Sequence, residues 1–308
     1  MSFAFFFPGQ GSQSLNMMNG FDDQTVIKAT FDEASTVLGQ DLWAMMNGEN
    51  TETINETINT QPLMLAAGIA TYRAYLEAGG KEPSMMAGHS LGEYTALVVA
   101  GSLSFADALK LVRLRAELMQ SAVPQGTGSM AAILGLDDDA VRAVCAEAAQ
   151  GEVVEAVNFN SPGQVVIAGS IAAVERAIET AKAKGAKRAL PLPVSVPSHC
   201  LLMKPAAEKL AEALKTVDIQ PSKIPVIHNA DVASYDNVDQ IKDALVRQLY
   251  SPVRWTETVN ALVALGITQS AECGPGKVLA SLAKRINKEA SCSALTNTEQ
   301  VNAFIAAH

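Results

Sequence analysis

The stretch from residue 85 to residue 100 reads MMAGHSLGEYTALVVA. Its apolar start, Met85 to Ala87, predicts a short buried strand, and the part from Glu93 to Ala100 predicts a helix. Between them, Gly88 to Gly92 match the pattern Gly-x-Ser-x-Gly, whose glycines allow a sharp turn that exposes the serine hydroxyl. Strand, turn and helix in this order predict an α/β fold in which Ser90 is a nucleophile.

Two backbone amides are candidates for stabilising an oxyanion. Ser90 lies at the start of the predicted helix, where the amide of Leu91 points toward the charge that develops when the hydroxyl attacks a carbonyl. A second glycine-rich loop, Phe7 to Gln13 (FPGQGSQ), follows the strand predicted by the apolar run Phe3 to Phe7. This loop lacks the Gly-Lys-Ser/Thr ending of a phosphate loop and the third glycine of a dinucleotide fingerprint. We therefore expect it to supply a backbone amide as the second donor.

A nucleophilic serine needs a base, and the chain has four histidines. His89 lies inside the turn and is expected to face away from the hydroxyl. His308 is the terminal residue, and His228 has no serine motif beside it. His199, in the run Pro197 to Cys200, is therefore the candidate base. The alternative for His199 is a structural histidine with satisfied hydrogen bonds.

One arginine lies on the apolar side of a predicted helix, Phe105 to Ala122. The apolar stripe of this helix consists of Ala108, Leu111, Val112, Leu118, Met119 and Ala122. Arg115 falls within that stripe, whereas Arg113 falls on the polar face. A buried guanidinium is costly without an anionic partner. That partner is either an internal Asp or Glu, or the carboxylate of a substrate held by the bidentate fork of Arg115.

The middle of the chain has a distinct order of predicted strands and helices. Its predicted elements are a strand at Met130 to Leu136, a helix at Asp137 to Ala149, strands at Val153 to Phe159 and Gln164 to Ala168, a helix at Ile171 to Lys184, and a strand at Arg188 to Val194. The order β, α, β, β, α, β is that of a ferredoxin-like unit. We assign residues 126–195 to it, and expect residues 1–125 and 196–308 to belong together.

Composition excludes several classes of protein. The 308 residues, 48% of them hydrophobic, can bury a full core. A net charge of −9 argues against a general nucleic-acid binder. No apolar stretch approaches the roughly 20 residues that span a bilayer, and the N-terminus lacks a secretory signal, so we expect a cytoplasmic protein. The four cysteines form no CxxC pair, so neither a zinc site nor a redox motif is indicated. Acyl transfer through a serine needs no metal or redox cofactor, and none is expected.

Seven features along the chain together match one known family. They are FPGQGSQ at 7–13, GHSLGEY at 88–94, Arg115, NFNSPGQVVIAG at 158–169, VPSH at 196–199, RQLYSPVRW at 247–255 and GPGKVL at 274–279. In these the sequence resembles the bacterial malonyl-CoA:acyl-carrier-protein transacylases over nearly its whole length. The resemblance implies an α/β-hydrolase-like core, residues 1–125 and 196–308, with an inserted ferredoxin-like subdomain at 126–195.

The resemblance also implies a role for each site residue. Ser90 is the nucleophile, His199 the base, Arg115 the carboxylate clamp, the amides of Gln10 and Leu91 the oxyanion hole, and the backbone carbonyl of Gln248 the group that orients the histidine. A neutral carbonyl would then take the place that a carboxylate has in a Ser-His-Asp triad. The residues around Asn160 line the site by the same resemblance.

The implied reaction passes a malonyl group from malonyl-CoA to Ser90, and then to the phosphopantetheine thiol of acyl carrier protein, in fatty acid biosynthesis. A serine hydrolase with the same turn is one alternative, and a non-catalytic acyl-binding module is another. Two basic clusters are candidates for docking the acidic carrier. They are Lys182, Lys184, Lys187 and Arg188, and Lys284, Arg285 and Lys288. Solvated helix ends are the alternative for both clusters.

Overall fold

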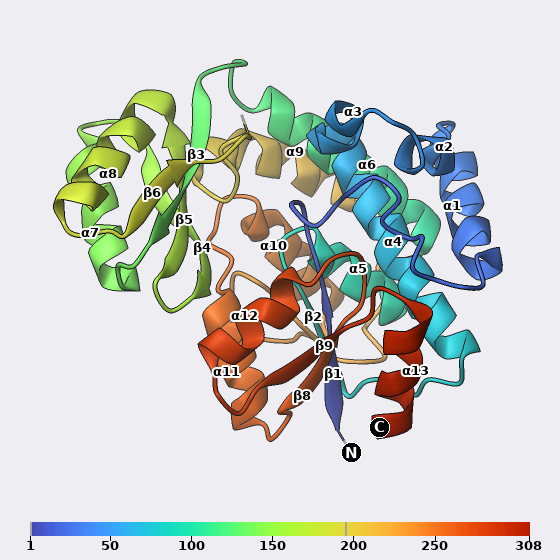
Figure 1. Cartoon of the computed structure of the whole chain (residues 1–308). Helices are drawn as coiled ribbons and strands as arrows, with labels where there is room; N and C mark the ends of the chain where they lie inside the picture. Colours follow the sequence, from blue (N-terminus) through green and yellow to red (C-terminus); the bar gives the residue numbers. More distant parts are fainter. Residues whose placement is uncertain (1, 195) are drawn as a thin grey trace.

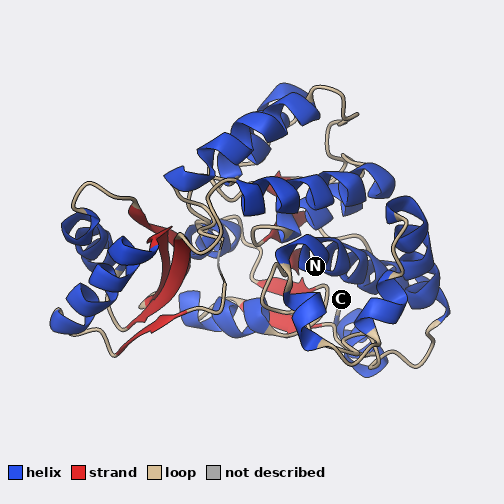
Figure 2. Cartoon of the chain, turned by 90° about the horizontal axis from the view of Figure 1, so that it is seen from above, coloured by secondary structure: helices blue, strands red, loops and turns tan. Residues whose placement is uncertain are grey.

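The computed structural model describes residues 2–194 and 196–308, so the predicted boundary at residue 195 lies outside the described residues. The fold is mixed α/β, with a parallel sheet and a separate antiparallel sheet (Figures 1 and 2). The parallel sheet has the order β7-β2-β1-β8-β9. Its strands are β1 (Phe3–Phe7), β2 (Met85–Gly88), β7 (Val226–Ile227), β8 (Gln269–Glu272) and β9 (Ser291–Ala294). Strands β1 and β2, which precede the two glycine-rich loops, pair with each other.

Helices make up most of the remaining described chain. Their bounds are α1 (Thr25–Leu38), α2 (Leu42–Met46), α3 (Thr51–Asn55), α4 (Thr57–Glu77), α5 (Gly92–Val99), α6 (Phe105–Ser121), α7 (Asp138–Ala149), α8 (Ile171–Ala183), α9 (Lys204–Leu214), α10 (Val238–Gln248), α11 (Trp255–Ala264), α12 (Val278–Ile286) and α13 (Thr298–Ala307), with a 3₁₀ turn at Leu201–Met203. Within residues 2–194 and 196–308, none of these helices has the length and apolar composition that crossing a membrane requires.

Strand β1 is buried along its whole length, as expected for a central strand of a parallel sheet. Phe3, Phe5 and Phe7 pack into the core formed with α1, α4 and α6. Ala4 and Phe6 point to the opposite face, where α11 and α12 cover the sheet. Successive side chains therefore join two cores, and the strand anchors the loop that follows Phe7.

The antiparallel sheet is formed by β3 (Gly128–Leu134), β4 (Val154–Ser161), β5 (Gln164–Ser170) and β6 (Arg188–Pro191), in the order β4-β5-β3-β6. The predicted order of strands and helices in this part of the chain is confirmed. Helices α7 and α8 cover one face of the sheet (Figure 1), and the other face packs against Cys200. Strand β6 ends earlier than predicted, because the N–H of Val194 donates to the carbonyl of Leu192 in its own segment and not to β3.

The two sheets are joined beside the site by backbone hydrogen bonds. The N–H of Phe159 in β4 donates to the carbonyl of Val253 at 3.0 Å, and the N–H of Val253 donates to Val157 at 2.8 Å. The side chain of Thr256 donates to the carbonyl of Phe159 at 3.0 Å. Strand β4 is thereby fixed to the segment that enters α11.

Helix α4 begins earlier than apolar periodicity alone predicts. The apolar residues recur at helical spacing from Leu63 to Ala78, but α4 begins at Thr57. The first turns carry Asn59, Thr60 and Gln61, which are polar and nevertheless buried. Because the prediction followed apolar periodicity, it missed a polar stretch that faces the interior, and Gln61 proves to belong to the site.

Candidate active site

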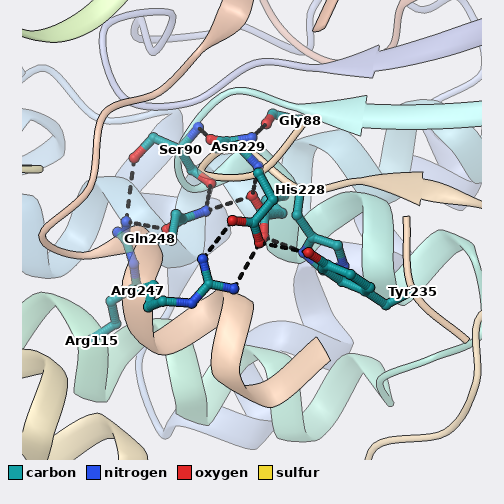
Figure 3. Close-up of polar contacts among 10 residues, drawn as sticks. Gly88, Ser90, Arg115, His228, Asn229, Tyr235, Arg247 and Gln248 are labelled. Atoms are coloured by element: carbon teal, nitrogen blue, oxygen red, sulfur yellow. Dashed lines mark hydrogen bonds and ion pairs between the residues drawn. The ribbon is translucent and has the colours of Figure 1, made fainter. Parts of the chain in front are cut away.

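Ser90 sits in a strained turn between β2 and α5. Its φ angle is 52°, in the left-handed region that residues with a side chain rarely adopt. Asn229 holds the turn from outside, because its Oδ1 accepts from the N–H of Ser90 at 2.7 Å and its Nδ2 donates to the carbonyl of Gly88 at 2.6 Å (Figure 3). The turn predicted from the glycine pattern is therefore present and externally supported.

Three glycines allow this turn to lie against the loop after β1. A Cβ atom on Gly88 would stand 1.9 Å from the backbone of Gly92, and one on Gly92 would stand 2.0 Å from the carbonyl oxygen of Phe7. A Cβ atom on Gly9 would stand 2.4 Å from the carbonyl oxygen of His89. Backbone thus contacts backbone here, and no side chain fits. The contact fixes the amides of both loops relative to Ser90.

Ser90 and His199 form a hydrogen-bonded pair. The Oγ atom of Ser90 lies 2.8 Å from Nε2 of His199, and Nδ1 of His199 lies 2.7 Å from the backbone carbonyl oxygen of Gln248. A carbonyl can only accept, so Nδ1 carries the proton and Nε2 is left to accept from the serine hydroxyl. This is the tautomer that a general base requires.

His199 is neutral in this environment. Burial lowers the pKa of His199 to about 3, the positive charge of Arg115 adds to the shift, and the hydrogen bond to the carbonyl of Gln248 opposes it. The side chain is almost fully buried. Nε2 is therefore unprotonated throughout the neutral range and available to take a proton from Ser90.

Arg115 is 1% exposed and lies beside this pair. Its Nη1 donates to Oε1 of Gln61 at 2.9 Å, and its Nη2 donates to Oε1 of Gln248 at 2.9 Å and to Oγ of Ser90 at 3.3 Å. Within residues 2–194 and 196–308, no carboxylate forms an ion pair with it. The sequence left two kinds of partner open for Arg115, and an internal Asp or Glu bonded directly to it is not found in the described part of the chain.

Gln10 and Leu91 line the same small cavity, which has a volume of about 130 Å³. The cavity is lined by Gln10, Thr57, Gln61, His89, Ser90, Leu91, Arg115, Met119, Met130, Asn158, Leu192, Val194, Val196, Ser198 and His199. Neither backbone N–H, of Gln10 or of Leu91, has an acceptor among the described residues. Two free donors beside a serine hydroxyl can stabilise an oxyanion. All six residues predicted for the site are thus brought together.

Several buried polar residues that support this group were not predicted from the sequence. His89 turns away from Ser90, as expected, and its Nε2 lies 2.8 Å from Oδ1 of Asn160 in β4. Glu93, His228 and Asn229 form a buried cluster behind the turn, and none of them was predicted to support the site. The signal available was an acidic residue directly after the Gly-x-Ser-x-Gly turn, on a helix that is otherwise uncharged.

Comparison with known proteins places the chain among the acyltransferases. The sequence matches the acyl transferase domain family over residues 4–300. The malonyl CoA-acyl carrier protein transacylase of Escherichia coli strain K12 is 55% identical over 304 residues, 98% of this chain and 98% of that protein. The chain belongs to the family of malonyl CoA-acyl carrier protein transacylases.

Solved structures agree with this assignment. The acyl-carrier-protein S-malonyltransferase of Burkholderia pseudomallei 1710b matches with a TM-score of 0.97 at 56% identity, covering 99% of this chain and 100% of that one. A malonyl-transacylase in complex with its type II PKS acyl-carrier protein matches with a TM-score of 0.98 at 53% identity, covering 100% of both chains.

Proposed function

We propose that this chain is an [acyl-carrier-protein] S-malonyltransferase, which moves a malonyl group from malonyl-CoA to the phosphopantetheine thiol of acyl carrier protein. The observation that carries the proposal is the Ser90–His199 hydrogen bond of 2.8 Å beside Arg115, a buried guanidinium that lacks a bonded carboxylate. The malonyl group has a free carboxylate, and a planar guanidinium binds a carboxylate through two parallel hydrogen bonds. The relatives in the same family carry this activity in their names.

In the first half-reaction, Oγ of Ser90 attacks the thioester carbonyl while Nε2 of His199 takes the hydroxyl proton. The amides of Gln10 and Leu91 stabilise the tetrahedral oxyanion. When the intermediate collapses, the carbon–sulfur bond breaks and His199 returns the proton to the departing sulfur of coenzyme A. Ser90 is left as a malonyl ester, with its carboxylate on Arg115.

In the second half-reaction the same groups act in reverse order. The thiol of the carrier gives its proton to His199 and attacks the ester carbonyl. The ester bond to Ser90 then breaks, the serine oxygen recovers the proton from His199, and the carrier leaves as the malonyl thioester. No atom is gained or lost by the protein. We place this reaction in fatty acid biosynthesis, with the cytoplasm as the predicted compartment.

The domain arrangement is part of the proposal. We propose an α/β-hydrolase-like catalytic core formed by residues 1–125 and 196–308, with a ferredoxin-like subdomain at 126–195. The parallel sheet with helices on both faces supports the first assignment, and the strand order β4-β5-β3-β6 supports the second. Ser90 lies in the core, whereas Met130 and Asn158 from the second sheet line the cavity.

Intact mass spectrometry after mixing the protein with malonyl-CoA tests the proposal. We expect one malonyl adduct, mapped to Ser90, which disappears when holo-carrier protein is added and reappears on the carrier. Ser90→Ala should form no adduct. A hydrolase would instead lose the adduct to water without carrier, and a binding module would never form it. Either result would refute the transferase assignment.

A further inference from the structure

Glu93, the first residue after the glycine of the turn, is fully buried in α5. Its carboxylate accepts three hydrogen bonds: from Nδ1 of His228 at 2.7 Å, from the N–H of Asn229 at 2.8 Å, and from Nε2 of Gln248 at 3.0 Å. A buried carboxylate is tolerated only when donors of this kind surround it. None of these contacts touches the reacting serine hydroxyl, so the proposed mechanism leaves Glu93 without a role.

The side chain of Gln248 connects Glu93 to Arg115. Its Nε2 donates to the carboxylate of Glu93 and also to the backbone carbonyl of Ser90 at 2.9 Å (Figure 3). Both partners can only accept, so the amide has one possible orientation and its Oε1 must face Nη2 of Arg115, 2.9 Å away. The anion and the cation are thus bound to opposite ends of one amide.

Arg115 needs a nearby negative charge, because burial lowers its pKa, and only the neighbouring acidic groups Tyr94 and Glu93 oppose that shift. Burial in turn raises the pKa of Tyr94 to about 12, so its phenol is neutral in the physiological range. Of these two groups, the carboxylate of Glu93 is therefore the one that can compensate the guanidinium. It stands one amide away from the guanidinium, and no direct ion pair joins them.

We propose that Glu93 is the resident counter-charge of Arg115, held at a distance by the amide of Gln248, and that it is a positioning residue for the clamp. This inference rests on the proposed function. A carboxylate bonded directly to Arg115 would occupy the guanidinium and compete with the carboxylate of the substrate. The amide of Gln248 lets Glu93 compensate the buried guanidinium in the empty enzyme. The Nε atom of Arg115 remains without a partner among the described residues.

The charge balance gives the proposal a specific signature. The pair Glu93 and Arg115 is neutral in the empty site, and a bound malonyl carboxylate adds one negative charge. In Glu93→Gln the empty site carries one positive charge, and the malonyl carboxylate neutralises it. The variant should therefore be less stable than the wild type when the site is empty. Malonyl-CoA should stabilise the variant more than it stabilises the wild type, because the malonyl carboxylate neutralises the site of the variant.

The experiment measures Tm for the wild type and Glu93→Gln, each alone, with saturating malonyl-CoA and with saturating acetyl-CoA. The substitution keeps the shape of the side chain, and His228 can switch tautomer to accept from the new amide. We expect the empty variant to lose roughly 3 °C or more. Malonyl-CoA should restore most of that loss, and acetyl-CoA should restore little. Glu272→Gln is the matched control, since Glu272 is a second fully buried glutamate that does not line the cavity.

A double variant separates the counter-charge from general damage. In the Arg115→Ala background, Glu93→Gln should no longer enlarge the stabilisation by malonyl-CoA. If Glu93→Gln lowers Tm equally in all three states, as a merely structural residue would, the inference is wrong. That failure is distinct from failure of the proposed function, because the wild type would still form the malonyl adduct and pass it to the carrier.

Discussion

The backbone carbonyl oxygen of Gln248 lies 2.7 Å from Nδ1 of His199, where a Ser-His-Asp triad has a carboxylate. A neutral carbonyl fixes the tautomer and the ring orientation, but it does not stabilise an imidazolium as an ionised Asp would. The positive charge of Arg115 nearby works against the imidazolium as well. His199 is thus expected to hold a proton only briefly, after it takes the proton from Ser90 and before it gives the proton to the leaving sulfur.

Replacing His199 by Ala should reduce malonyl transfer by roughly two to four orders of magnitude, because the general base and the acid that protonates the leaving group are lost together. The fold should survive, since the ring contacts one side chain and one carbonyl by hydrogen bonds. Transfer is measured with holo-carrier, and the fold by circular dichroism. Near-normal transfer with an intact fold would show that another group acts as base.

The pH dependence of acylation should follow the low pKa of His199. A histidine with an ordinary pKa of 6.5 loses its function as a base below that pH, whereas one with a pKa of about 3 stays neutral far into the acid range. The rate of acylation by malonyl-CoA should therefore show no acid limb near pH 6.5. Arg115→Ala removes a charge that lowers this pKa, so its limb should move to higher pH. A wild-type limb at 6.5 would contradict the burial argument.

Arg115→Ala should lose malonyl transfer far more than acetyl transfer. A charge-assisted contact is worth about 1.5 to 3 kcal/mol, which corresponds to a roughly 10- to 150-fold change in the preference between the two acyl groups. The measurement compares kcat/KM for malonyl-CoA and acetyl-CoA. Arg115→Lys is a useful companion, because it keeps the charge and loses the fork. Equal losses for both acyl groups would instead assign Arg115 a structural role.

The structure shows which cations of the two basic clusters proposed for carrier docking are paired with carboxylates. Lys182 pairs with Glu179 at 2.8 Å and Lys184 pairs with Glu147 at 2.5 Å, so these two cations are partly neutralised. No ion pair joins Lys187, Arg188, Lys284 or Arg285 to a carboxylate of the described chain. Arg285 in α12 contacts Gln164 in β5, with Nη1 and Oε1 3.4 Å apart, which connects the second cluster to the antiparallel sheet.

Reversing these four free cations to glutamate should raise KM for the acidic carrier at low salt, because electrostatic steering is lost. Acylation by malonyl-CoA alone should be nearly unchanged. The control variant makes the same change in net charge elsewhere, by reversing Lys28, Lys110, Lys209 and Lys215, all of which are exposed. Equal carrier kinetics in the two variants would refute docking at these clusters and leave the assignment of Ser90 untouched.

Glu272 should make stability depend on pH. Burial raises its pKa from 4.5 to about 7, and hydrogen bonds from the first N–H groups of α12 oppose the shift. The folded state therefore binds this proton more tightly than the unfolded chain, so the stabilisation is complete below pH 4.5 and is lost as the pH rises to about 7. Relative to Glu272→Gln, the wild type should lose up to roughly 3 kcal/mol between pH 4.5 and 8 in urea unfolding. An unchanged difference across this range would contradict the shift.

Local patterns predicted the parts of the site that the chain forms locally. The turn at Ser90 and the strand before it are adjacent in sequence, so glycine spacing and apolar runs were enough. The element order of the antiparallel sheet followed for the same reason. Arg115 was correctly placed on an inward face by helical periodicity, because a guanidinium within an apolar stripe has no polar surface to reach.

The supporting polar cluster could not be predicted, because its members come from distant parts of the chain. Glu93 contacts His228 across 135 positions and Gln248 across 155. Arg115 meets Gln61 across 54 positions, and Gln61 lies in a helix start that apolar periodicity did not detect. Which polar residues converge depends on how α4, α5 and α10 pack, and single-sequence patterns carry no information on that packing.

The backbone contacts at Gly9, Gly88 and Gly92 bear on how a mutational scan of this chain would be interpreted. Any side chain there collides with a neighbouring carbonyl or amide, so every substitution will score as severely as replacement of Ser90, although none of the three donates a side chain to the chemistry. Loss of activity at these positions would therefore show that the backbone contact is disrupted, and not that a catalytic group is lost. A library aimed at new acyl groups should therefore leave these glycines fixed and vary cavity-lining side chains such as Met119 and Met130.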